Sequence, residues 1–286
     1  EETKDQEYCI FHKPNKSEEE AREFYKKFLK KFKPKKEIIR VSGREIERLV
    51  FEEAVDCIKY ALPKIPKDVD FSFKYSIFRR DVLFSGATFE GDALFIRATF
   101  EGDALFNKAT FAGSALFVEV TYERLAAFTE ATFKGFASFN EAIFKGFTSF
   151  DKATFKGNAL FDGATFEELA NFRGKREKCK FYGELIFSNT EFRKGLFIDI
   201  PSECFKLPSA EAEACRVQRI YYEREGRKDD ADRMFARERR ALRRAEIEEA
   251  KANVREVKRL VASSPRKVER VKAELKVWFK YLLAKG

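Results

Sequence analysis

The sequence has few of the features from which enzyme active sites are built. Histidine occurs once in 286 residues, and the 14 glycines include no loop of the kind that cradles a phosphate. Neither a nucleophile elbow nor an acid–base pair in a predicted pocket can be recognised. We therefore predict a protein that is not an enzyme and that has no cofactor and no small-molecule substrate.

Methionine and glutamine are also scarce. Methionine occurs once and glutamine only at positions 6 and 218, whereas charged residues make up 37% of the chain. Proteins of thermophiles favour Glu, Lys and Arg and avoid thermolabile side chains. The composition therefore indicates a thermophilic source.

The sequence contains neither a long apolar run nor a signal peptide. A membrane-spanning helix needs about 18 or more apolar residues in a row, and no such stretch is present. The cysteines are odd in number and widely scattered, which argues against a disulfide framework and favours a reducing cytosol. They are Cys9, Cys57, Cys179, Cys204 and Cys215.

Aromatic residues, in contrast, recur at every eleventh position between Phe84 and Phe172, and a second series lies between them at alternating steps of five and six. A fixed short period is typical of repeat folds, in which each unit buries its apolar side by stacking on its neighbours. Small-x-aromatic triplets point two side chains the same way, as a β-strand does. We interpret the rings as a structural core. They form two ladders: Phe84, Phe95, Phe106, Phe117, Phe128, Phe139, Phe150, Phe161 and Phe172, and Phe89, Phe100, Phe111, Tyr122, Phe133, Phe144, Phe155 and Phe166.

The repeat length also sets the size of one coil. Eleven residues at about 3.3 Å each span roughly 36 Å, which is too short a perimeter to enclose two rings and two alanines. Two repeats, arranged as four sides, leave room. Recognisable units run from Phe73 to Phe197, so we predict about five to six coils, stacked about 4.8 Å apart in a four-sided rod.

The small-x-Phe units resemble those of the pentapeptide-repeat family, whose motif has a small residue two positions before a central Leu or Phe. The resemblance implies a right-handed quadrilateral β-helix, so the predicted fold class is a β-solenoid with α-helical flanks. One extra residue in every second unit departs from the family pattern and predicts two wider corners in each coil. The extra residues are Asp92, Asp103, Ser114, Leu125, Phe136, Phe147, Asn158 and Leu169.

The chain divides into three predicted regions: 1–70, a helical capping region; 71–200, the β-helix; and 201–286, a basic helical region. A break in the repeat between Phe172 and Phe181 predicts a looped insertion in the second region.

The first region contains a capping box. The box, Ser17-Glu18-Glu19-Glu20, opens a predicted helix through Phe32, and a second helix or an irregular segment is predicted from Glu45 to Leu62. These elements would cover one open end of the β-helix.

The last region is basic, with 23 Lys and Arg against 15 Asp and Glu, so its net charge of +8 accounts for nearly all of the +9 of the chain. We predict a helical hairpin from a helix over 209–226 and another over 229–260, because Gly226 is a natural stop. Pro265 begins a further, amphipathic helix. Its apolar residues lie three and four apart: Val268, Val271, Leu275, Trp278, Phe279, Leu282 and Leu283.

Three interpretations of this basic region stay open. The last helix packs on the rod or a sister subunit, or it lies at an anionic membrane surface, where Lys, Arg, Trp and Tyr concentrate. Nucleic-acid binding is the least favoured, because no groove-reading motif accompanies its candidate phosphate contacts, Arg239, Arg240, Arg243 and Arg244. The candidate membrane-proximal or partner residues are Arg266, Lys267, Arg270, Lys272, Trp278, Phe279 and Tyr281.

The hairpin also resembles a helical region that, in a subgroup of pentapeptide-repeat proteins, joins the β-helix to a two-span, potassium-channel-like membrane module. The resemblance rests on Tyr221-Tyr222-Glu223-Arg224-Glu225-Gly226 and on Phe235-Ala236-Arg237-Glu238-Arg239-Arg240. It implies a cytoplasmic domain at the inner face of a membrane, with the module beyond Gly286.

One metal site can be considered. Cys9 and His12 form a Cys-x2-His pair that contains the one histidine. A structural zinc ion needs four ligands, and no second cysteine pair lies near this one in the sequence. The pair would therefore be half of a site, completed only by residues upstream of Glu1.

These observations favour a cytosolic scaffold or regulatory domain, attached to a channel-like module and contacting a protein partner or sister subunits. The alternative is a soluble protein-interaction module. Some pentapeptide-repeat proteins mimic duplex DNA against topoisomerases, which requires a strongly acidic rod. Over 71–200 the acidic and basic side chains balance, so that function is disfavoured.

Overall fold

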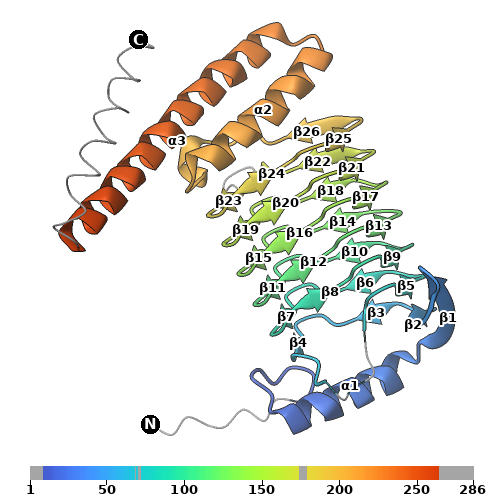
Figure 1. The fold of residues 1–286 in the computed structure, drawn as a ribbon. Helices are drawn as coiled ribbons and strands as arrows, with labels where there is room; N and C mark the ends of the chain where they lie inside the picture. The colour runs from blue at the N-terminus through green and yellow to red at the C-terminus, as the bar shows by residue number, and fades with distance from the viewer. Residues whose placement is uncertain (1–8, 68, 70–71, 174–178, 264–286) are drawn as a thin grey trace, which may run out of the picture.

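The computed structural model describes residues 9–67, 69, 72–173 and 179–263. In this part of the chain, a four-sided β-solenoid of about five turns stands between helices at its two ends (Figure 1). The predicted fold class is thereby confirmed. The helices are α1 (Glu18–Phe32), the short 3-10 helix η1 (Ser202–Cys204), α2 (Pro208–Arg224) and α3 (Lys228–Ser263).

Four sheets form the sides of the rod, and we name them A to D in the order in which the chain visits them. Sheet A contains β1 (Lys35–Val41), β2 (Arg44–Phe51), β5 (Ile77–Phe78), β9 (Thr99–Phe100), β13 (Thr121–Tyr122), β17 (Ile143–Phe144), β21 (Thr165–Phe166) and β25 (Glu191–Phe192). Sheet B contains β3 (Val55–Asp56), β6 (Val82–Leu83), β10 (Ala104–Leu105), β14 (Ala126–Ala127), β18 (Thr148–Ser149), β22 (Leu169–Asn171) and β26 (Gly195–Phe197). Sheet C contains β4 (Ala61–Leu62), β7 (Thr88–Phe89), β11 (Thr110–Phe111), β15 (Thr132–Phe133), β19 (Thr154–Phe155) and β23 (Lys180–Phe181). Sheet D contains β8 (Ala93–Leu94), β12 (Ala115–Leu116), β16 (Ala137–Ser138), β20 (Ala159–Leu160) and β24 (Leu185–Ile186).

The strand register gives the length of one coil directly. In the regular part each strand pairs in parallel with the equivalent strand two repeats further on, as Thr110 does with Thr132. The separation along the chain is larger where Val55 pairs with Val82 and where Thr154 pairs with Lys180. The first coil therefore carries five extra residues before β5, and the chain carries four between β22 and β23, where the sequence predicted an insertion.

The aromatic residues form continuous stacks inside the rod. Each ring lies nearly parallel to the ring two repeats away, as in the pair Phe106 and Phe128, whose centroids are 5.0 Å apart at an interplanar angle of 2°. The ring one repeat away in the same ladder is met edge-on, as Phe117 meets Phe128 at 76°. Edge-to-face and offset contacts are the geometries that aromatic quadrupoles favour. All ladder rings from Phe84 to Phe172 are at most 4% exposed.

The shorter and the wider corners of each coil are subject to different steric constraints. At the shorter corners the chain makes a tight turn, closed by a hydrogen bond such as that from the Ala98 N–H to the Phe95 carbonyl, 3.0 Å. The third residue of each turn has a positive φ, but it is usually not glycine: Arg97 has φ 57° and Glu119 has φ 55°. At the wider corners glycines such as Gly135 have ordinary φ values, and it is the closeness of the neighbouring coil that excludes a Cβ.

Tyr122 is the one tyrosine in the two ladders, and its hydroxyl is buried in the core with no hydrogen-bond partner among the described residues. An unsatisfied buried hydroxyl costs free energy, so Tyr122→Phe is expected to raise the free energy of unfolding by about 1 kcal/mol. Chemical denaturation followed by circular dichroism measures this difference. The matched reverse variant, Phe144→Tyr in the same stack, is expected to be destabilised. A less stable Tyr122→Phe protein would contradict the absence of a partner.

The N-terminal end of the rod is closed by α1. Its capping box is present as predicted: the Ser17 Oγ accepts from the Glu20 N–H, and the Glu20 carboxylate accepts from the Ser17 N–H. Phe28 packs edge-on against Phe51 and Phe73, so the helix seals the first coil.

The prediction of a second helix or irregular segment from Glu45 to Leu62 is wrong. Residues of this segment form most of β2, then β3 and β4, and pair with the coil above. The solenoid therefore begins before residue 71, where the sequence placed its start. In the strand register, the first coil has Cys57 and Leu62 at the positions of Phe84 and Phe89, which hid it from the repeat pattern.

The C-terminal end of the rod is covered by the predicted helical hairpin. Helix α2 lies across the last coil, and α3 returns antiparallel along α2 (Figure 1). The turn between them contains Gly226, whose φ of 71° suits glycine. Among the described residues, no helix is both long enough and apolar enough to cross a bilayer.

Candidate functional site

The hairpin is fastened to the rod by side chains that take the place of the next coil. The open edge of a solenoid leaves backbone groups without strand partners. In the last coil, the Phe187 N–H donates to Glu213 Oε1 (2.9 Å) and the Ile198 N–H donates to Gln218 Oε1 (2.8 Å). Arg224 donates to the carbonyl oxygens of Phe192 and Arg193. All three anchoring side chains come from α2, which therefore acts as an edge cap.

A buried ionic cluster joins α2 to α3. The Glu211 side chain is 1% exposed; its carboxylate accepts from Arg237 Nε (2.7 Å) and Ser202 Oγ (2.6 Å), and it is paired with Arg244. Burial alone raises the pKa of Glu211, but hydrogen bonds from Ser202, Arg237 and Arg244 outweigh it and hold the pKa below its ordinary value. The carboxylate is therefore charged at neutral pH, and it fixes the angle between the two helices.

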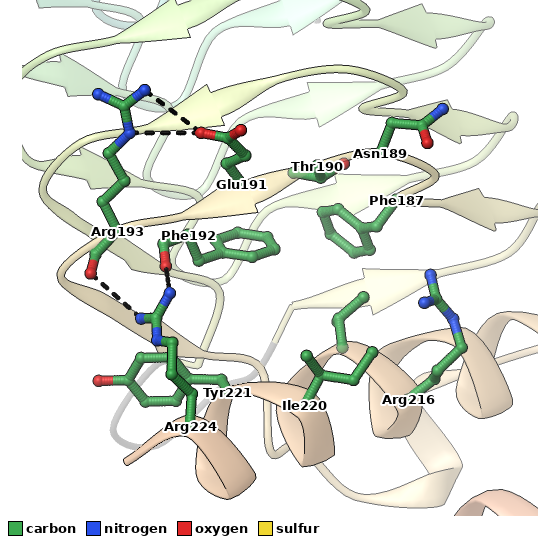
Figure 2. Close-up of a pocket in the computed structure, with 11 residues that line it drawn as sticks. Phe187, Asn189, Thr190, Glu191, Phe192, Arg193, Arg216, Ile220, Tyr221 and Arg224 are labelled. Carbon is green, nitrogen blue, oxygen red and sulfur yellow. Dashed lines mark hydrogen bonds and ion pairs between the residues drawn. The ribbon is translucent and has the colours of Figure 1, made fainter.

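A groove of about 440 Å³ lies between the last coil and α2. Its apolar lining includes Val217. Figure 2 shows Phe187 and Phe192 on the side of the last coil and Ile220, 47% exposed, on the side of α2. The arginines around it have partners: Figure 2 shows Arg193 paired with Glu191 and Arg224 bound to backbone carbonyls. The groove suits an apolar side chain better than a charged ligand.

The outer faces of the rod differ in chemistry. Most strands have two residues, of which one side chain points into the rod and the other points outward. The outward residue is threonine on much of sheets A and C and leucine on much of sheet D. On sheet D, Leu116 is paired in register with Leu94, so their side chains lie about 4.8 Å apart along the rod. We call the apolar residues of this region the D-face patch: Leu94, Ile96, Leu116, Val118 and Phe136, of which the last is 38% exposed and the others are half-buried.

A family model described as Pentapeptide repeats (9 copies) matches residues 73–121 and 127–174. The rod is a pentapeptide-repeat β-solenoid. The match confirms the resemblance that the small-x-Phe units predicted. A search of curated proteins and a search of solved structures each gave no match to the chain. Within the pentapeptide-repeat rod, the matched residues hold the D-face patch but not the first coil, and they end before the hairpin.

The arginines considered for nucleic-acid binding do not act as one group. Arg239, Arg240, Arg243 and Arg244 are all exposed on α3, but Arg244, whose side chain is 48% exposed, is bound to the buried carboxylate of Glu211. A phosphate backbone would have to compete with that carboxylate. The seven candidate membrane-proximal residues, Arg266, Lys267, Arg270, Lys272, Trp278, Phe279 and Tyr281, lie outside the described residues.

Cys9 and His12 lie together at the surface beside the cap. The Cys9 Sγ is 2.9 Å from His12 Nδ1, and the imidazole meets the Tyr60 ring edge-on. Within the residues that the structure describes, no group of three or more His, Cys, Asp or Glu side chains is placed to hold a metal ion. The two side chains supply two of the four ligands that structural zinc requires.

Sequence reasoning missed the Glu211 cluster and the anchoring roles of Glu213, Gln218 and Arg224. Gln218 carried one signal: it is one of two glutamines in the chain, and it is fully buried. For Glu211 the sequence indicates only an acidic residue near the start of a predicted helix. Its partners Arg237 and Arg244 lie far along the chain, and a single sequence contains no rule that pairs them.

Proposed function

We propose that the protein is a non-enzymatic interaction scaffold in which the pentapeptide-repeat rod presents the D-face patch to a protein partner. Repeat solenoids of this kind are commonly protein-interaction modules. The observation that carries the proposal is the group of outward apolar side chains on and beside sheet D, from the in-register pair Leu94 and Leu116 to the exposed Phe136 one coil further on, between the threonine-rich faces of sheets A and C. Contiguous apolar surface on a soluble fold is typical of a protein-binding site.

The rigidity of the assembly supports the same function. Each coil is held to the next by backbone hydrogen bonds, and the hairpin is held to the last coil by Glu213, Gln218 and Arg224. A partner bound on the rod would therefore stand at a fixed distance from a partner bound on the helices. Fixed spacing between two docking surfaces is what a scaffold provides.

Site-specific photocrosslinking tests the proposal. Benzoylphenylalanine at Phe136, which replaces one exposed aromatic ring with another, is expected to crosslink one discrete protein in cells that express the chain. The matched control carries the same residue at Thr110, on the outward face of sheet C. Equal crosslinking from both positions, or none from Phe136, would contradict a docking role for the D-face patch.

A location beside a membrane, in a channel-like protein with sister subunits, is our second and finer proposal. Its support is sequence: the excess of basic residues after residue 200 and the Trp278-Phe279-Lys280-Tyr281 run. It would make the described rod a cytoplasmic scaffold at the inner face. Flotation with anionic vesicles at low salt separates the two ideas, since a version lacking residues 265–286 should lose vesicle binding and keep the Phe136 crosslink.

A further inference from the structure

Four exposed residues at one corner of the rod form a column. Each comes directly after a buried aromatic residue on the side of sheet C, whose strands β15, β19 and β23 follow one another along the rod (Figure 1). Each donates its backbone N–H to the carbonyl oxygen of the aromatic residue one coil earlier, at 2.8 or 2.9 Å, so successive members lie about 4.8 Å apart. We call them the lysine column: Lys134, Lys156, Tyr182 and Lys206.

The lysine column has no counter-charge in the described structure. None of its lysines forms an ion pair with a described residue. Lys180, which is exposed on β23, adds a further positive charge close by. The two carboxylates nearest in sequence to its upper members do not neutralise it: Glu184 accepts from Ser209 Oγ at 2.9 Å, and Glu203 forms no ion pair with a described residue. The column is therefore an exposed row of like charges.

The equivalent position at the other wide corner shows that the fold does not require such a row. There the first residue after each sheet A ring is also charged, but ion pairs between neighbouring coils join opposite charges. The pairs are Arg79 with Glu101, Glu123 with Lys145, and Glu167 with Arg193. Like charges on neighbouring strands repel each other, so the lysine column is unfavourable for the rod alone. An anionic ligand would offset this repulsion.

We propose that the lysine column binds an acidic α-helical segment of the protein partner that docks on the D-face patch. The inference rests on the proposed function, because the patch supplies the apolar half of the interface. Lys134 and the exposed Phe136 lie two residues apart at the same corner, and the exposed Ile186 follows four residues after Tyr182. A helix with an acidic stripe beside an apolar stripe can therefore contact the column and the patch together.

The spacing of the coils favours a helix over an extended strand. Side chains on one face of a helix recur about every 5.4 Å, whereas those on one face of a strand recur about every 6.6 Å. Over the three intervals from Lys134 to Lys206, a helix along the rod would lose register by about 2 Å and a strand by about 5 Å. The long lysine side chains can absorb the smaller mismatch. Acidic residues at i, i+4, i+7 and i+11 would then meet successive members of the column.

Single-stranded nucleic acid is the other anion to consider. Proteins that bind it combine a basic groove with aromatic side chains on which the bases stack. Tyr182, which is 49% exposed, is the one aromatic residue of the lysine column. The neighbouring D-face patch is mostly aliphatic, since Phe136 is its one aromatic member, and aliphatic side chains offer no stacking surface to a base. Carboxylates on an amphipathic helix use both surfaces, so the acidic helix is the better occupant.

Selection from a random library of helical peptides displayed on phage is the first test. The target is the full chain, and the counter-target is the double variant Lys134→Gln, Lys156→Gln, which should fold because both side chains are exposed. The enriched peptides are expected to have Glu or Asp at steps of three and four, beside a stripe of Leu, Ile or Phe. Enriched peptides without an acidic stripe, or no peptide that depends on the two lysines, would overturn the inference.

Fluorescence anisotropy with the most enriched peptide then measures the contribution of the charges. The Lys134→Gln, Lys156→Gln protein should bind it about tenfold more weakly, and added salt should reduce that difference. The matched control, Lys108→Gln with Lys145→Gln, removes two exposed rod lysines outside the column and should bind within about twofold of the unmodified protein. Equal weakening in the control would overturn the inference.

Phe136→Ser separates this inference from the proposed function. If that change weakens peptide binding and the two lysine changes do not, the patch keeps its docking role and the lysine column loses its own. The reverse result would support the column and contradict the patch. A single-stranded DNA of 20 nucleotides, about the length of the peptides, is the competing probe. If it bound through Lys134 and Lys156 more tightly than the peptide, the column would be assigned to nucleic acid and the inference would be overturned.

Discussion

Replacing Gly135 by alanine is expected to lower the free energy of unfolding by about 3 kcal/mol, more than most changes of a single methyl group. A Cβ at this position would lie 2.6 Å from the Gly113 carbonyl oxygen and 2.8 Å from its carbonyl carbon, in the neighbouring coil. Backbone atoms cannot rotate away as a side chain can. Relief would require the two coils to separate, which would lengthen their hydrogen bonds and part the aromatic stacks on either side.

The measurement is the denaturation midpoint and slope in guanidinium chloride, with Gly163→Ala as the matched control. Gly163 also lies at a corner, but its φ is 66° and its nearest neighbour is the flexible Glu141 side chain, at 3.3 Å. Alanine there bears the cost of a left-handed conformation, about 1 kcal/mol. If the two variants were equally stable, coil spacing would not be the reason for glycine at position 135.

The same close approach of neighbouring coils accounts for a column of glycines that runs along one edge of the rod. Gly113, Gly135 and Gly157 follow one another at steps of two repeats, each above the previous one, and each would place a Cβ against the coil below. Glycine is commonly used where a chain must turn sharply. In the structure the tight turns tolerate Arg97 and Glu119 at positive φ, while glycine is kept where the backbones approach most closely.

The regular part of the fold could be predicted because it is periodic. Phe84 to Phe172 repeat without interruption, and the volume of two rings was enough to derive a coil of two repeats, which the pairing of Thr110 with Thr132 confirms. The first coil could not be predicted in this way, because Cys57 and Leu62 stand where the ladders would have phenylalanines. A short apolar run without the repeat is ambiguous between helix and strand.

The two helices of the C-terminal hairpin were predicted, but the contacts that fasten them to each other and to the rod were not. Gly226, a natural stop between two helical segments, was sufficient to place two helices. The side chains that fasten them depend on contacts between distant residues, such as Gln218 with Ile198 and Glu211 with Arg237.

Removing the charge of Glu211 should open the hairpin. Glu211→Gln leaves Arg237, whose side chain is 14% exposed, without its closest carboxylate. Removing one partner of a buried ion pair costs about 3 kcal/mol or more where the remaining charge is left uncompensated. Asp199, 3.4 Å from Arg237, still offsets part of that charge, so we take the lower end of this range. We therefore expect the equilibrium between docked and undocked α3 to shift about 100-fold towards undocking, while the aromatic rod stays folded.

The Cys215 thiol reports this opening. Cys215 lies on α2 under α3, packed with Tyr222, Ala231 and Met234, and burial raises its pKa to about 12. A thiol reagent should therefore label it only when the helices part, and labelling at neutral pH should be about 100 times faster in Glu211→Gln. The control is Glu223→Gln, on the same helix, whose exposed pair with Arg219 is worth less than about 1 kcal/mol. Equal labelling rates in the two variants would mean that the cluster does not hold the hairpin.

Acid should have the same effect as the substitution. Because the pKa of Glu211 in the folded protein lies below its ordinary value of 4.5, the cluster stabilises the hairpin fully above that pH, and the stabilisation is lost as the pH falls through the lowered pKa. Amide exchange in α3, corrected for its intrinsic pH dependence, should therefore accelerate below pH 4.5 in the unmodified protein. In Glu211→Gln the exchange should be fast both above and below pH 4.5, because the Glu211 carboxylate is no longer present to titrate. An acid-induced step of the same size in both proteins would assign the pH dependence to carboxylates other than Glu211.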